Sequence, residues 1–300
     1  MNREETFRSG FVSVLGRPNV GKSSLVNALV GRKVTIVSPK PQTTRRRVQA
    51  VLTTPEAQIV FVDTPGIQRP RDLLGRVMAR AAAESLAEVD AVLMVIDAVR
   101  ARGEEDRAAA ALLGRVQAPT LLVVNKIDLV HGAGDETAAA AARDLSYAGP
   151  VLPVSAVTGQ GLAELQRWII RQLGPGPKYF PDGMRTDQSD SLLVAELIRE
   201  QVLLRTGDEV PHATAIVVEE MAPRLNGKLF IRAAVVVERE SQKAIVIGAG
   251  GRQLKEIGRN ARANIEHLLG EPIFLDLWVR VDKGWRDSGR RLREFGYESE

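Results

Sequence analysis

A glycine-rich segment near the N-terminus constrains the fold more than any other part of the sequence. GRPNVGKS, residues 16–23, matches the pattern G-x-x-x-x-G-K-[ST]. The apolar stretch FVSVL precedes it, and KSSLVNALV, which has helical spacing, overlaps its end. A loop between a strand and a helix in this pattern points backbone N–H groups at phosphate. The sequence therefore predicts a nucleotide site, in which Lys22 supplies positive charge to the β- and γ-phosphates and the Ser23 hydroxyl a ligand for Mg²⁺. The residues predicted to hold the nucleotide here are Gly16, Asn19, Val20, Gly21, Lys22, Ser23 and Ser24.

The region after this loop repeats one pattern, in which a short apolar strand is followed by a turn and a helical stretch. Continuous runs of Val, Ile and Leu are typical of parallel strands buried on both faces, and their alternation with helices indicates a doubly wound α/β domain. VQAVLTT, residues 48–54, is expected to add an antiparallel edge strand. The alanine-rich stretch at 138–142 is expected to form a surface helix. The expected strands are 11–15, 58–63, 91–97, 120–125 and 151–155.

Two further segments add candidate residues for the phosphate end of the nucleotide. VDTPG places Asp63 at a strand end, where its carboxylate can hold a magnesium-bound water, and the Gly66 amide can meet the γ-phosphate. SPKPQTTRRRV contains two candidate threonines for a switch that senses this phosphate. We favour Thr44 as the second protein ligand of Mg²⁺, with Thr43 as the alternative. The predicted metal ligands are therefore Ser23, Thr44 and Asp63, and the predicted catalytic residues are Lys22, Thr44, Asp63 and Gly66.

Two segments at later strand ends predict the base that is recognised. VVNKID supplies Asn125 to brace the loop, Lys126 to cover the base and Asp128 to accept hydrogen bonds from guanine N1–H and its exocyclic amine. Adenine offers the wrong pattern to this carboxylate. PVSA can bring the backbone amides of Ser155 and Ala156 to guanine O6. In this order the segments predict a GTPase domain that binds GTP and GDP with Mg²⁺.

The hydrolysis site departs from well-known GTPases at one position. Ile67 follows the DTPG segment, where a glutamine commonly orients the attacking water. Isoleucine cannot do this, and Gln68 is expected to point elsewhere, so we expect slow intrinsic turnover. Asn19 could help to hold K⁺ as a missing cationic element, or it could serve only as a turn residue.

The composition of the chain changes at Gly174. GPGPKYFPDG, rich in proline and glycine, predicts a linker over residues 175–187, between a domain at 1–174 and a second at 188–300. The second domain is expected to begin with a strongly amphipathic helix that carries Leu193, Leu197 and Leu204 near one face. Two apolar-alternating strands around 213–221 and 229–238, a helix at 253–269 and a strand at 273–281 follow. The short run AIVI, residues 244–247, suggests a further strand.

The bulk composition limits the classes of partner. The net charge is +4, which favours polyanionic partners. The sequence has no cysteine, which excludes disulfides and thiolate metal sites, and its three histidines are widely scattered. With neither a signal-peptide pattern nor a membrane-spanning run, the chain is expected to be soluble and cytoplasmic.

These motifs in this order, followed by VIGAGG at 246–251, resemble the Era family of bacterial GTPases over essentially the whole chain. The resemblance implies a mixed, mostly parallel P-loop GTPase domain followed by a smaller α+β KH domain of type II. It implies that AIVI is helical and that a G-x-x-G loop joins two helices and clamps the RNA backbone. It also implies binding to the 3′ region of 16S rRNA, a role in 30S subunit assembly and peripheral contact with the inner membrane. We expect no DNA binding, and a monomer. The predicted RNA-binding residues are Gly248, Ala249, Gly250, Gly251, Arg252 and Lys255.

Some details of the RNA site stay open at the level of sequence. The family usually has a lysine where this chain has Ala249, so a phosphate contact is lost unless Arg252 replaces it. Base recognition is placed around Ile247, Ile257 and residues 230–233. The basic C-terminal segment 282–297 could contact RNA or protein, or cap the fold. The alternative function is an RNA-binding assembly scaffold for which GTP is mainly a structural ligand.

Overall fold

The computed structural model describes residues 7–66, 70–100, 103–114, 116–130, 134–224 and 227–297. By its internal contacts the chain divides into two compact units. Unit 1 comprises most of the first 187 residues, and unit 2 comprises the C-terminal region from Gln188 together with two earlier segments, Ile36–Thr43 and Pro70–Val77. Within the described residues, every helix is too short or too polar to cross a membrane.

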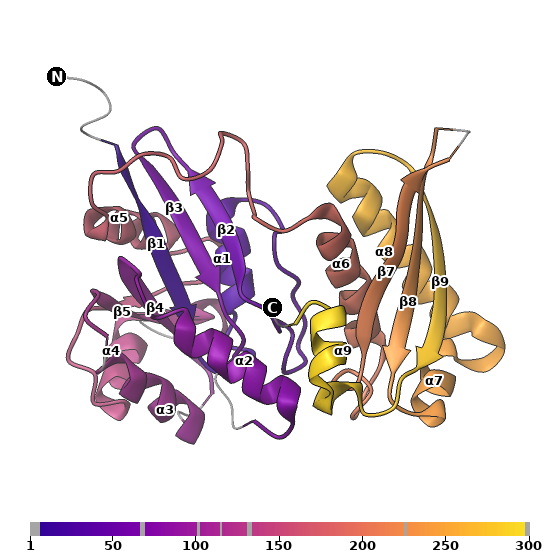
Figure 1. The fold of residues 1–300 in the computed structure, drawn as a ribbon. Helices are drawn as coiled ribbons and strands as arrows, with labels where there is room; N and C mark the ends of the chain where they lie inside the picture. The colour runs from indigo at the N-terminus through magenta and orange to yellow at the C-terminus, as the bar shows by residue number, and fades with distance from the viewer. Residues whose placement is uncertain are drawn as a thin grey trace. The chain divides into compact units, whose positions relative to one another are not determined.

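Unit 1 is built on a six-stranded sheet with strand order β2-β3-β1-β4-β5-β6 (Figure 1). The edge strand β2 pairs antiparallel with β3, and the remaining pairs are parallel. The predicted edge strand at 48–54 and the parallel arrangement are thereby confirmed. The strands are β1 (Arg8–Leu15), β2 (Val48–Thr53), β3 (Ala57–Asp63), β4 (Ala91–Asp97), β5 (Thr120–Asn125) and β6 (Val151–Pro153).

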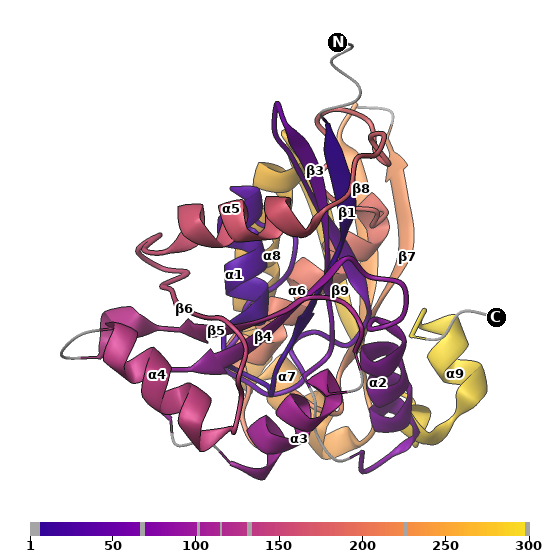
Figure 2. The ribbon, with the colours of Figure 1, turned by 90° about the vertical axis from the view of Figure 1, so that its left-hand side faces the viewer.

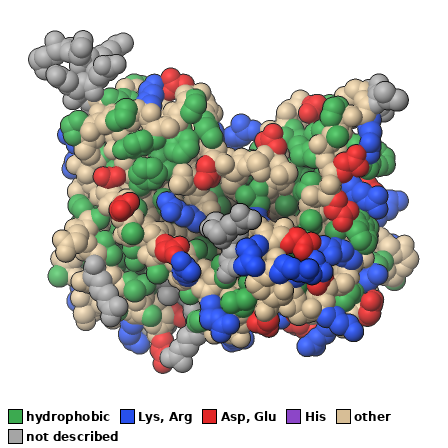
Figure 3. Space-filling model, viewed as in Figure 1, with side chains coloured by type: hydrophobic (Ala, Val, Ile, Leu, Met, Phe, Trp, Pro, Cys, Tyr) green, Lys and Arg blue, Asp and Glu red, His purple; other side chains and the backbone are tan. Residues whose placement is uncertain are grey.

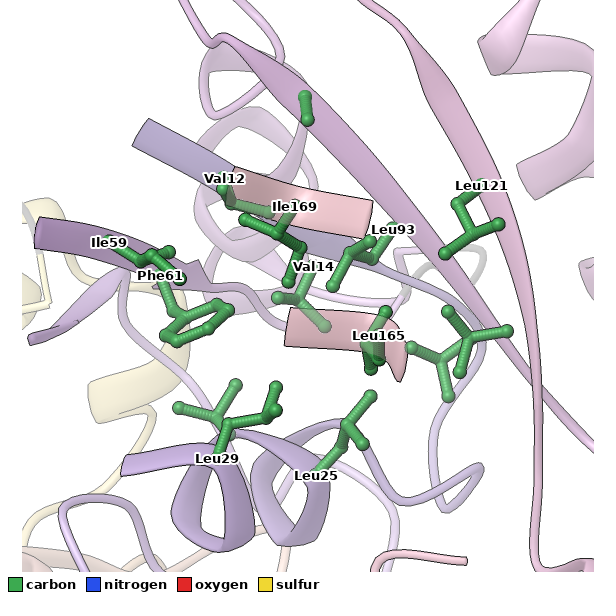
Figure 4. Packing of buried hydrophobic residues seen from close by; sticks show 14 of the residues in the cluster. Val12, Val14, Leu25, Leu29, Ile59, Phe61, Leu93, Leu121, Leu165 and Ile169 are labelled. Carbon is green, nitrogen blue, oxygen red and sulfur yellow. The ribbon is translucent and has the colours of Figure 1, made fainter. Parts of the chain in front are cut away.

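Helices cover both faces of this sheet, which explains why the strands lack polar alternation. Every residue of β3 and β4 is buried. Helices α1 and α5 lie on one side of the sheet and α3 and α4 on the other (Figure 2). Side chains such as Leu25, Phe61 and Leu165 fill the first of these layers (Figure 4). The helices are α1 (Lys22–Val30), α2 (Leu73–Glu84), α3 (Glu104–Leu113), α4 (Gly134–Asp144) and α5 (Leu162–Gln172), with a 3-10 turn at Ile127–Leu129.

Helix α4 corrects one expectation from the sequence. The alanine-rich stretch is helical, but it is not simply a surface helix, because Ala138, Ala141 and Ala142 are buried in the core beneath β4 and β5. Alanine is small enough to let the helix backbone approach the sheet closely. High helix propensity alone does not reveal which alanines are buried.

The segment 175–187 follows the edge of the unit 1 sheet. The backbone amide of Val51 donates to the carbonyl of Arg185 at 2.8 Å, and Ala50 bridges Thr186. The fully buried Gln58 accepts hydrogen bonds from the amides of Tyr179 and Phe180 at 2.7 and 2.9 Å. It also donates to the Phe180 carbonyl at 2.9 Å. This proline- and glycine-rich segment is therefore tied to the sheet by backbone pairing with β2 and by the Gln58 side chain of β3, and it covers the edge of the sheet.

Unit 2 contains a three-stranded sheet with order β7-β8-β9, in which β7 and β8 are antiparallel and β8 and β9 parallel. Helices α6 and α8 lie on one side of it (Figure 1). The elements are α6 (Asp190–Arg205), β7 (Ala215–Pro223), β8 (Leu229–Val237), α7 (Glu240–Ile247), α8 (Arg252–Leu269), β9 (Ile273–Val281) and α9 (Gly289–Glu294), with 3-10 turns at Ala249–Gly251 and Trp285–Asp287.

Two expectations for unit 2 need correction. AIVI is the end of helix α7 rather than a strand, as the family resemblance implied, because a short apolar run cannot separate the two states. Helix α6 is not strongly amphipathic: it is buried continuously from Leu197 to Leu203, whereas Leu204 is 48% exposed. The reason is that residues 36–43, which belong to the same unit, also pack on it. The Val37 amide donates to Glu200, and the buried Arg199 donates to the Thr43 carbonyl.

Candidate nucleotide and RNA sites

The phosphate loop lies between β1 and α1, as predicted. Lys22 is buried, and its Nζ donates to the carbonyls of Gly16 and Arg17 at 2.9 and 3.0 Å. Burial lowers the pKa of Lys22 to about 8, a shift that the Asp63 carboxylate opposes and the Arg17 guanidinium reinforces. The ammonium is therefore poorly solvated, and the partners that it has among the described residues are neutral carbonyls, so an anion placed beside it would stabilise its charge.

Three oxygen-bearing side chains gather at the start of α1. Ser23 Oγ donates to Asp63 Oδ2 at 2.8 Å, and Thr44 Oγ1 lies 3.0 Å from Ser23 Oγ and 3.4 Å from Asp63 Oδ2. Thr43 instead donates to the Lys40 carbonyl at 2.7 Å. Of the two threonines considered from the sequence, the structure brings Thr44 to the site.

This cluster fits a hard divalent cation. Burial raises the pKa of Asp63, although Lys22 and the neighbouring hydroxyls partly oppose that shift. Its Oδ1 is buried and has no hydrogen-bond partner among the described residues. A buried carboxylate oxygen without a donor is costly unless a cation or proton satisfies it. Hydroxyl and carboxylate oxygens are the ligand types that Mg²⁺ prefers.

Close backbone approaches explain two of the glycines in this site. Gly66 lies against the phosphate loop, where a Cβ would come within 2.7 Å of the Pro18 nitrogen. Gly21 has a φ of 98°, and a Cβ there would lie 2.3 Å from Asn125 Nδ2. A side chain at either position would displace the loop that holds the phosphates. Ile67, the expected departure at the hydrolysis site, and Gln68 lie outside the described residues.

Asn125 connects three loops. Its Nδ2 donates to the Val20 carbonyl at 3.0 Å, and its Oδ1 accepts from the Ala156 amide at 3.1 Å. Asn125 itself is almost fully buried at the end of β5. One amide group thus holds the phosphate loop and the segment after β6 against each other, which is the bracing geometry predicted from the sequence.

The remaining base-site residues also lie at the ends of β4 to β6. Lys126 adopts a left-handed backbone conformation, and its Nζ donates to Asp97 Oδ2 at 2.7 Å and to the Asn19 carbonyl at 2.8 Å. Asp128 Oδ1 accepts a 2.5 Å hydrogen bond from the Ser155 hydroxyl. The Lys126 stem and the Asp128 carboxylate are therefore both held in place by neighbouring loops.

Sequence reasoning missed two acidic partners of this site. Burial alone would raise the pKa of Asp97, but hydrogen bonds from Lys126 and two backbone amides outweigh that effect and lower it. Asp106, at the start of α3, accepts the Arg17 Nε–H at 3.1 and 3.0 Å through its two oxygens. Its side chain is only 2% exposed and that of Arg17 11%. The position of Asp97 at the end of a predicted strand could have signalled its role, whereas no local pattern marks Asp106.

The second glycine loop joins α7 to α8, as expected of a G-x-x-G loop. Gly248, Gly250 and Gly251 have φ values of 70°, 60° and 76°, in the region that favours glycine. A Cβ on Gly248 would lie 2.6 Å from that of Gln253, whereas a Cβ on Gly250 or Gly251 would have no described residue within 4 Å apart from its neighbours in the chain. The exposed backbone at these two glycines can be approached closely by a ligand. Arg252 Nε donates to the Ala249 carbonyl at 3.2 Å, so this arginine side chain lies over the loop.

A groove of about 880 Å³ begins beside this loop. It runs between α8 and β9, and exposed basic side chains of α8, including Arg252, Lys255 and Arg259, line one wall. The lining of this groove does not include Ile257 or residues 230–233, around which base recognition is predicted. Ile257 is fully buried, and the strand that lines the groove is β9, through Leu275 and Leu277, rather than β8.

The C-terminal segment after β9 caps the fold. Trp285 is fully buried and donates from Nε1 to the Ala213 carbonyl at 3.0 Å. The rings of Phe295 and Tyr297 pack on it at 5.6 and 5.8 Å between centroids. The aromatic residues of this segment therefore have a structural role, as in the capping alternative considered from the sequence.

Comparison with known proteins agrees with this two-part arrangement. A family model described as 50S ribosome-binding GTPase matches residues 11–126, and one described as KH domain matches residues 209–286. GTPase Era of Carboxydothermus hydrogenoformans is 46% identical over 293 residues, which are 97% of this chain and 98% of the relative. The chain belongs to the Era family of GTPases. GTPase Era of Lactobacillus helveticus is also 46% identical, over 98% of both proteins.

Two solved Era structures share the whole architecture. A crystal structure of Era in complex with MgGDPNP and nucleotides 1506–1542 of 16S ribosomal RNA has a TM-score of 0.94 and 39% identity, covering 98% of this chain and 100% of that one. Aquifex aeolicus Era bound to GDP·AlF4⁻ gives the same values. The predicted fold class, a P-loop GTPase domain followed by a KH domain, is therefore confirmed, as is membership of a GTPase family.

Proposed function

We propose that this Era-family chain binds and hydrolyses GTP with Mg²⁺, binds the 3′ region of 16S rRNA and acts in assembly of the 30S subunit. The observation that carries this proposal is the match in sequence and fold to Era in complex with MgGDPNP and a 16S rRNA segment. The chain's own geometry agrees, because the nucleotide motifs converge in unit 1 and a basic groove lies beside the G-x-x-G loop in unit 2.

At the phosphate end, Ser23, Thr44 and Asp63 would hold Mg²⁺, which when bound offsets phosphate charge. Lys22 would exchange its two carbonyl partners for phosphate oxygens, and the Gly66 amide would mark the presence of the γ-phosphate. These residues act by positioning and charge rather than by covalent chemistry, as is usual in phosphoryl transfer. Lys22, Thr44, Asp63 and Gly66 stay our proposal for the catalytic residues.

At the base end, Asp128 would accept from guanine, and the Ser155 and Ala156 amides would meet guanine O6. The Ser155 hydroxyl already orients the Asp128 carboxylate at 2.5 Å. A preformed polar site of this kind rejects a mismatched base by about 10⁴-fold or more.

The RNA site is assigned to residues 248–252 with Lys255. The open glycine backbone would approach the ribose-phosphate chain, and the α8 basic residues would contact phosphates. The alternative is that GTP is a structural ligand of an RNA-binding scaffold. Multiple-turnover phosphate release with and without RNA tests this: turnover under both conditions no faster than that of a Lys22→Ala variant would favour the scaffold.

A monovalent cation is a further part of the proposal. Asn19 has a φ of 66°, which asparagine tolerates, and its carbonyl is held by Lys126. Its side chain would help to bind K⁺ near the phosphates, where an added cationic group is worth about 10³–10⁵ in rate. Turnover in KCl should exceed that in NaCl at equal ionic strength. Equal rates in the two salts would remove K⁺ from the mechanism.

We retain the division into a GTPase domain at 1–174, a linker at 175–187 and a KH domain at 188–300 as the functional organisation. We also propose that the protein is monomeric and cytoplasmic, with peripheral contact to the inner membrane. Sedimentation of the purified protein with anionic vesicles in low and physiological salt tests the membrane contact. If the protein does not sediment with the vesicles in either salt concentration, the membrane contact is removed from the proposal and the ribosomal role stays.

A further inference from the structure

The sheet of unit 2 has a face that the helices leave uncovered. Side chains alternate along each strand, so Ile231 and Leu275 point toward α6 and α8 while Phe230 and Phe274 point the other way. Figure 3 views the unit from this side and shows hydrophobic, basic and acidic side chains interspersed over the strands. We call the open part of this surface the aromatic face. It comprises Arg224, Phe230, Arg232, Phe274 and Trp278.

Two phenylalanines on neighbouring strands form a stack on this face. The rings of Phe230 and Phe274 lie 5.7 Å apart with an interplanar angle of 13°. The Arg224 guanidinium lies 4.0 Å from the Phe230 centroid. Phe274 ends the stack and is 59% exposed. A large aromatic side chain held in a fixed orientation and open to solvent is a platform for another planar group.

A second aromatic side chain continues the face along β9. Trp278 lies four residues after Phe274, so it projects from the same side of the strand, roughly 13 Å away. The Arg232 guanidinium lies 6.0 Å from the centroid of the Trp278 ring. The Trp278 Nε1–H donates to the Glu219 carboxylate at 2.9 Å. Beyond Trp278 the face is closed, because Arg280 packs on Phe295 of the C-terminal segment. The open region is therefore limited to the end near Phe274.

This face adjoins the groove. Asp276, between the two aromatic residues on β9, lines the groove and also lies 3.7 Å from Arg232. Strand β9 is thus shared: Leu275, Asp276 and Leu277 line the groove, and Phe274 and Trp278, on either side of this stretch, belong to the aromatic face. A strand of RNA that leaves the groove over β9 would reach Phe274 directly.

The charges of the two surfaces differ. Among the described residues, the groove is lined by four basic residues and two acidic ones, so its lining keeps a net positive charge that suits phosphate, although Arg259 pairs with Glu256 at 3.2 Å. On the aromatic face each arginine is already balanced, because Arg224 pairs with Glu220 at 2.9 Å and Arg232 lies 3.5 Å from Glu219. Such a face gains little from phosphate, but its rings can stack on bases and its carboxylates can accept from base amino groups.

We propose that the aromatic face binds unpaired nucleobases of the RNA strand beyond the part held in the groove, with Phe274 as the principal stacking residue. This inference rests on the proposed RNA-binding function. It extends the site from the backbone clamp of about four nucleotides to a longer stretch in which bases, rather than phosphates, are recognised.

Binding of labelled RNA to the full-length protein tests this. The probes are fluorescein-labelled oligoribonucleotides from the 1506–1542 region of 16S rRNA, one of about four nucleotides centred on the groove-binding part and one of about twelve that extends it on both sides. The variants are Phe274→Ala, Phe274→Trp and, as a matched control, Tyr179→Ala, which removes an exposed aromatic residue of unit 1. Lys255→Ala serves as the groove variant, and circular dichroism checks the fold of each.

We expect Phe274→Ala to weaken binding of the long RNA by about 5- to 150-fold, the loss of one base–aromatic stack. It should leave the short RNA and the salt dependence unchanged. Phe274→Trp and Tyr179→Ala should behave as the wild type, while Lys255→Ala should weaken both RNAs. If the wild type binds neither RNA, the proposed function itself fails. If the wild type binds both and Phe274→Ala binds the long RNA equally well, or loses both equally, the aromatic face is not an RNA site.

Discussion

The buried ion pair between Arg17 and Asp106 gives the sharpest test of how unit 1 holds its phosphate loop. Arg17 is the second residue of the loop, and its own carbonyl accepts a hydrogen bond from Lys22. Asp106→Asn keeps the shape of the side chain but removes the carboxylate charge that the guanidinium faces. Because the Asp106 side chain is 2% exposed and that of Arg17 11%, water cannot replace the lost partner.

Removing one partner of a buried pair costs about 3–5 kcal/mol. For a unit of this size, each kcal/mol shifts the unfolding temperature by about 2–4 °C, so we expect a decrease of about 6–20 °C. Calorimetry of the full chain measures this decrease in unfolding temperature. The relevant transition is the one whose midpoint moves to higher temperature when Mg·GDP is added. The control is Glu84→Gln, which breaks the exposed pair with Arg80 and should cost about 1 kcal/mol or less.

A double variant separates charge from packing. If the penalty comes from an unpaired buried charge, Arg17→Met combined with Asp106→Leu should be closer to the wild type than Asp106→Asn alone. If the Asp106→Asn protein unfolds at the same temperature as the Glu84→Gln control, the reasoning is refuted, because the buried pair would then contribute no more stability than a surface pair.

Three further results are expected. Asp128→Asn should weaken GTP binding and favour xanthosine nucleotides, since an amide can donate to the carbonyl at purine C2; unchanged GTP affinity in a filter-binding assay would overturn the base assignment. The affinity for Mg·GTP should fall as pH rises above about 8, where the pKa of Lys22 lies without nucleotide, because binding phosphate then requires proton uptake, by up to about tenfold per pH unit. Lys22→Arg stays charged, and an equal decline in that variant would assign the effect to another group. Gln58→Ala should speed hydrogen exchange at the amides of Tyr179 and Phe180 by about tenfold or more, from the hydrogen bonds it loses; unaltered exchange would show that other contacts hold the segment.

The nucleotide site could largely be predicted from sequence because most of its parts follow a strand. Parallel strands bring their carboxyl ends to one edge, so Asp63, Asn125 and Ser155 had to converge once the strands were recognised. The sequence favoured Thr44 over Thr43 but could not exclude Thr43, because the two residues differ in which groups their hydroxyls contact.

Other features depend on contacts between distant segments and have no local signal. Asp106 meets Arg17 across 89 positions of the sequence. The burial of Ile257 and the choice of β9 as groove wall follow from how α8 packs on the sheet, which the alternation of a single strand does not determine. The continuous burial of α6 from Leu197 to Leu203 was missed for the same reason, because part of its cover comes from residues 36–43.

The position of Asn125 has a consequence for any attempt to redesign nucleotide preference. Its single carboxamide restrains the loop that would grip the phosphates and the loop that would read the purine ring. A change that loosens one contact loosens the other, so selectivity and tightness cannot be tuned separately at this residue. Variants meant to accept a different purine should leave this side chain intact and alter only the rim of the base pocket.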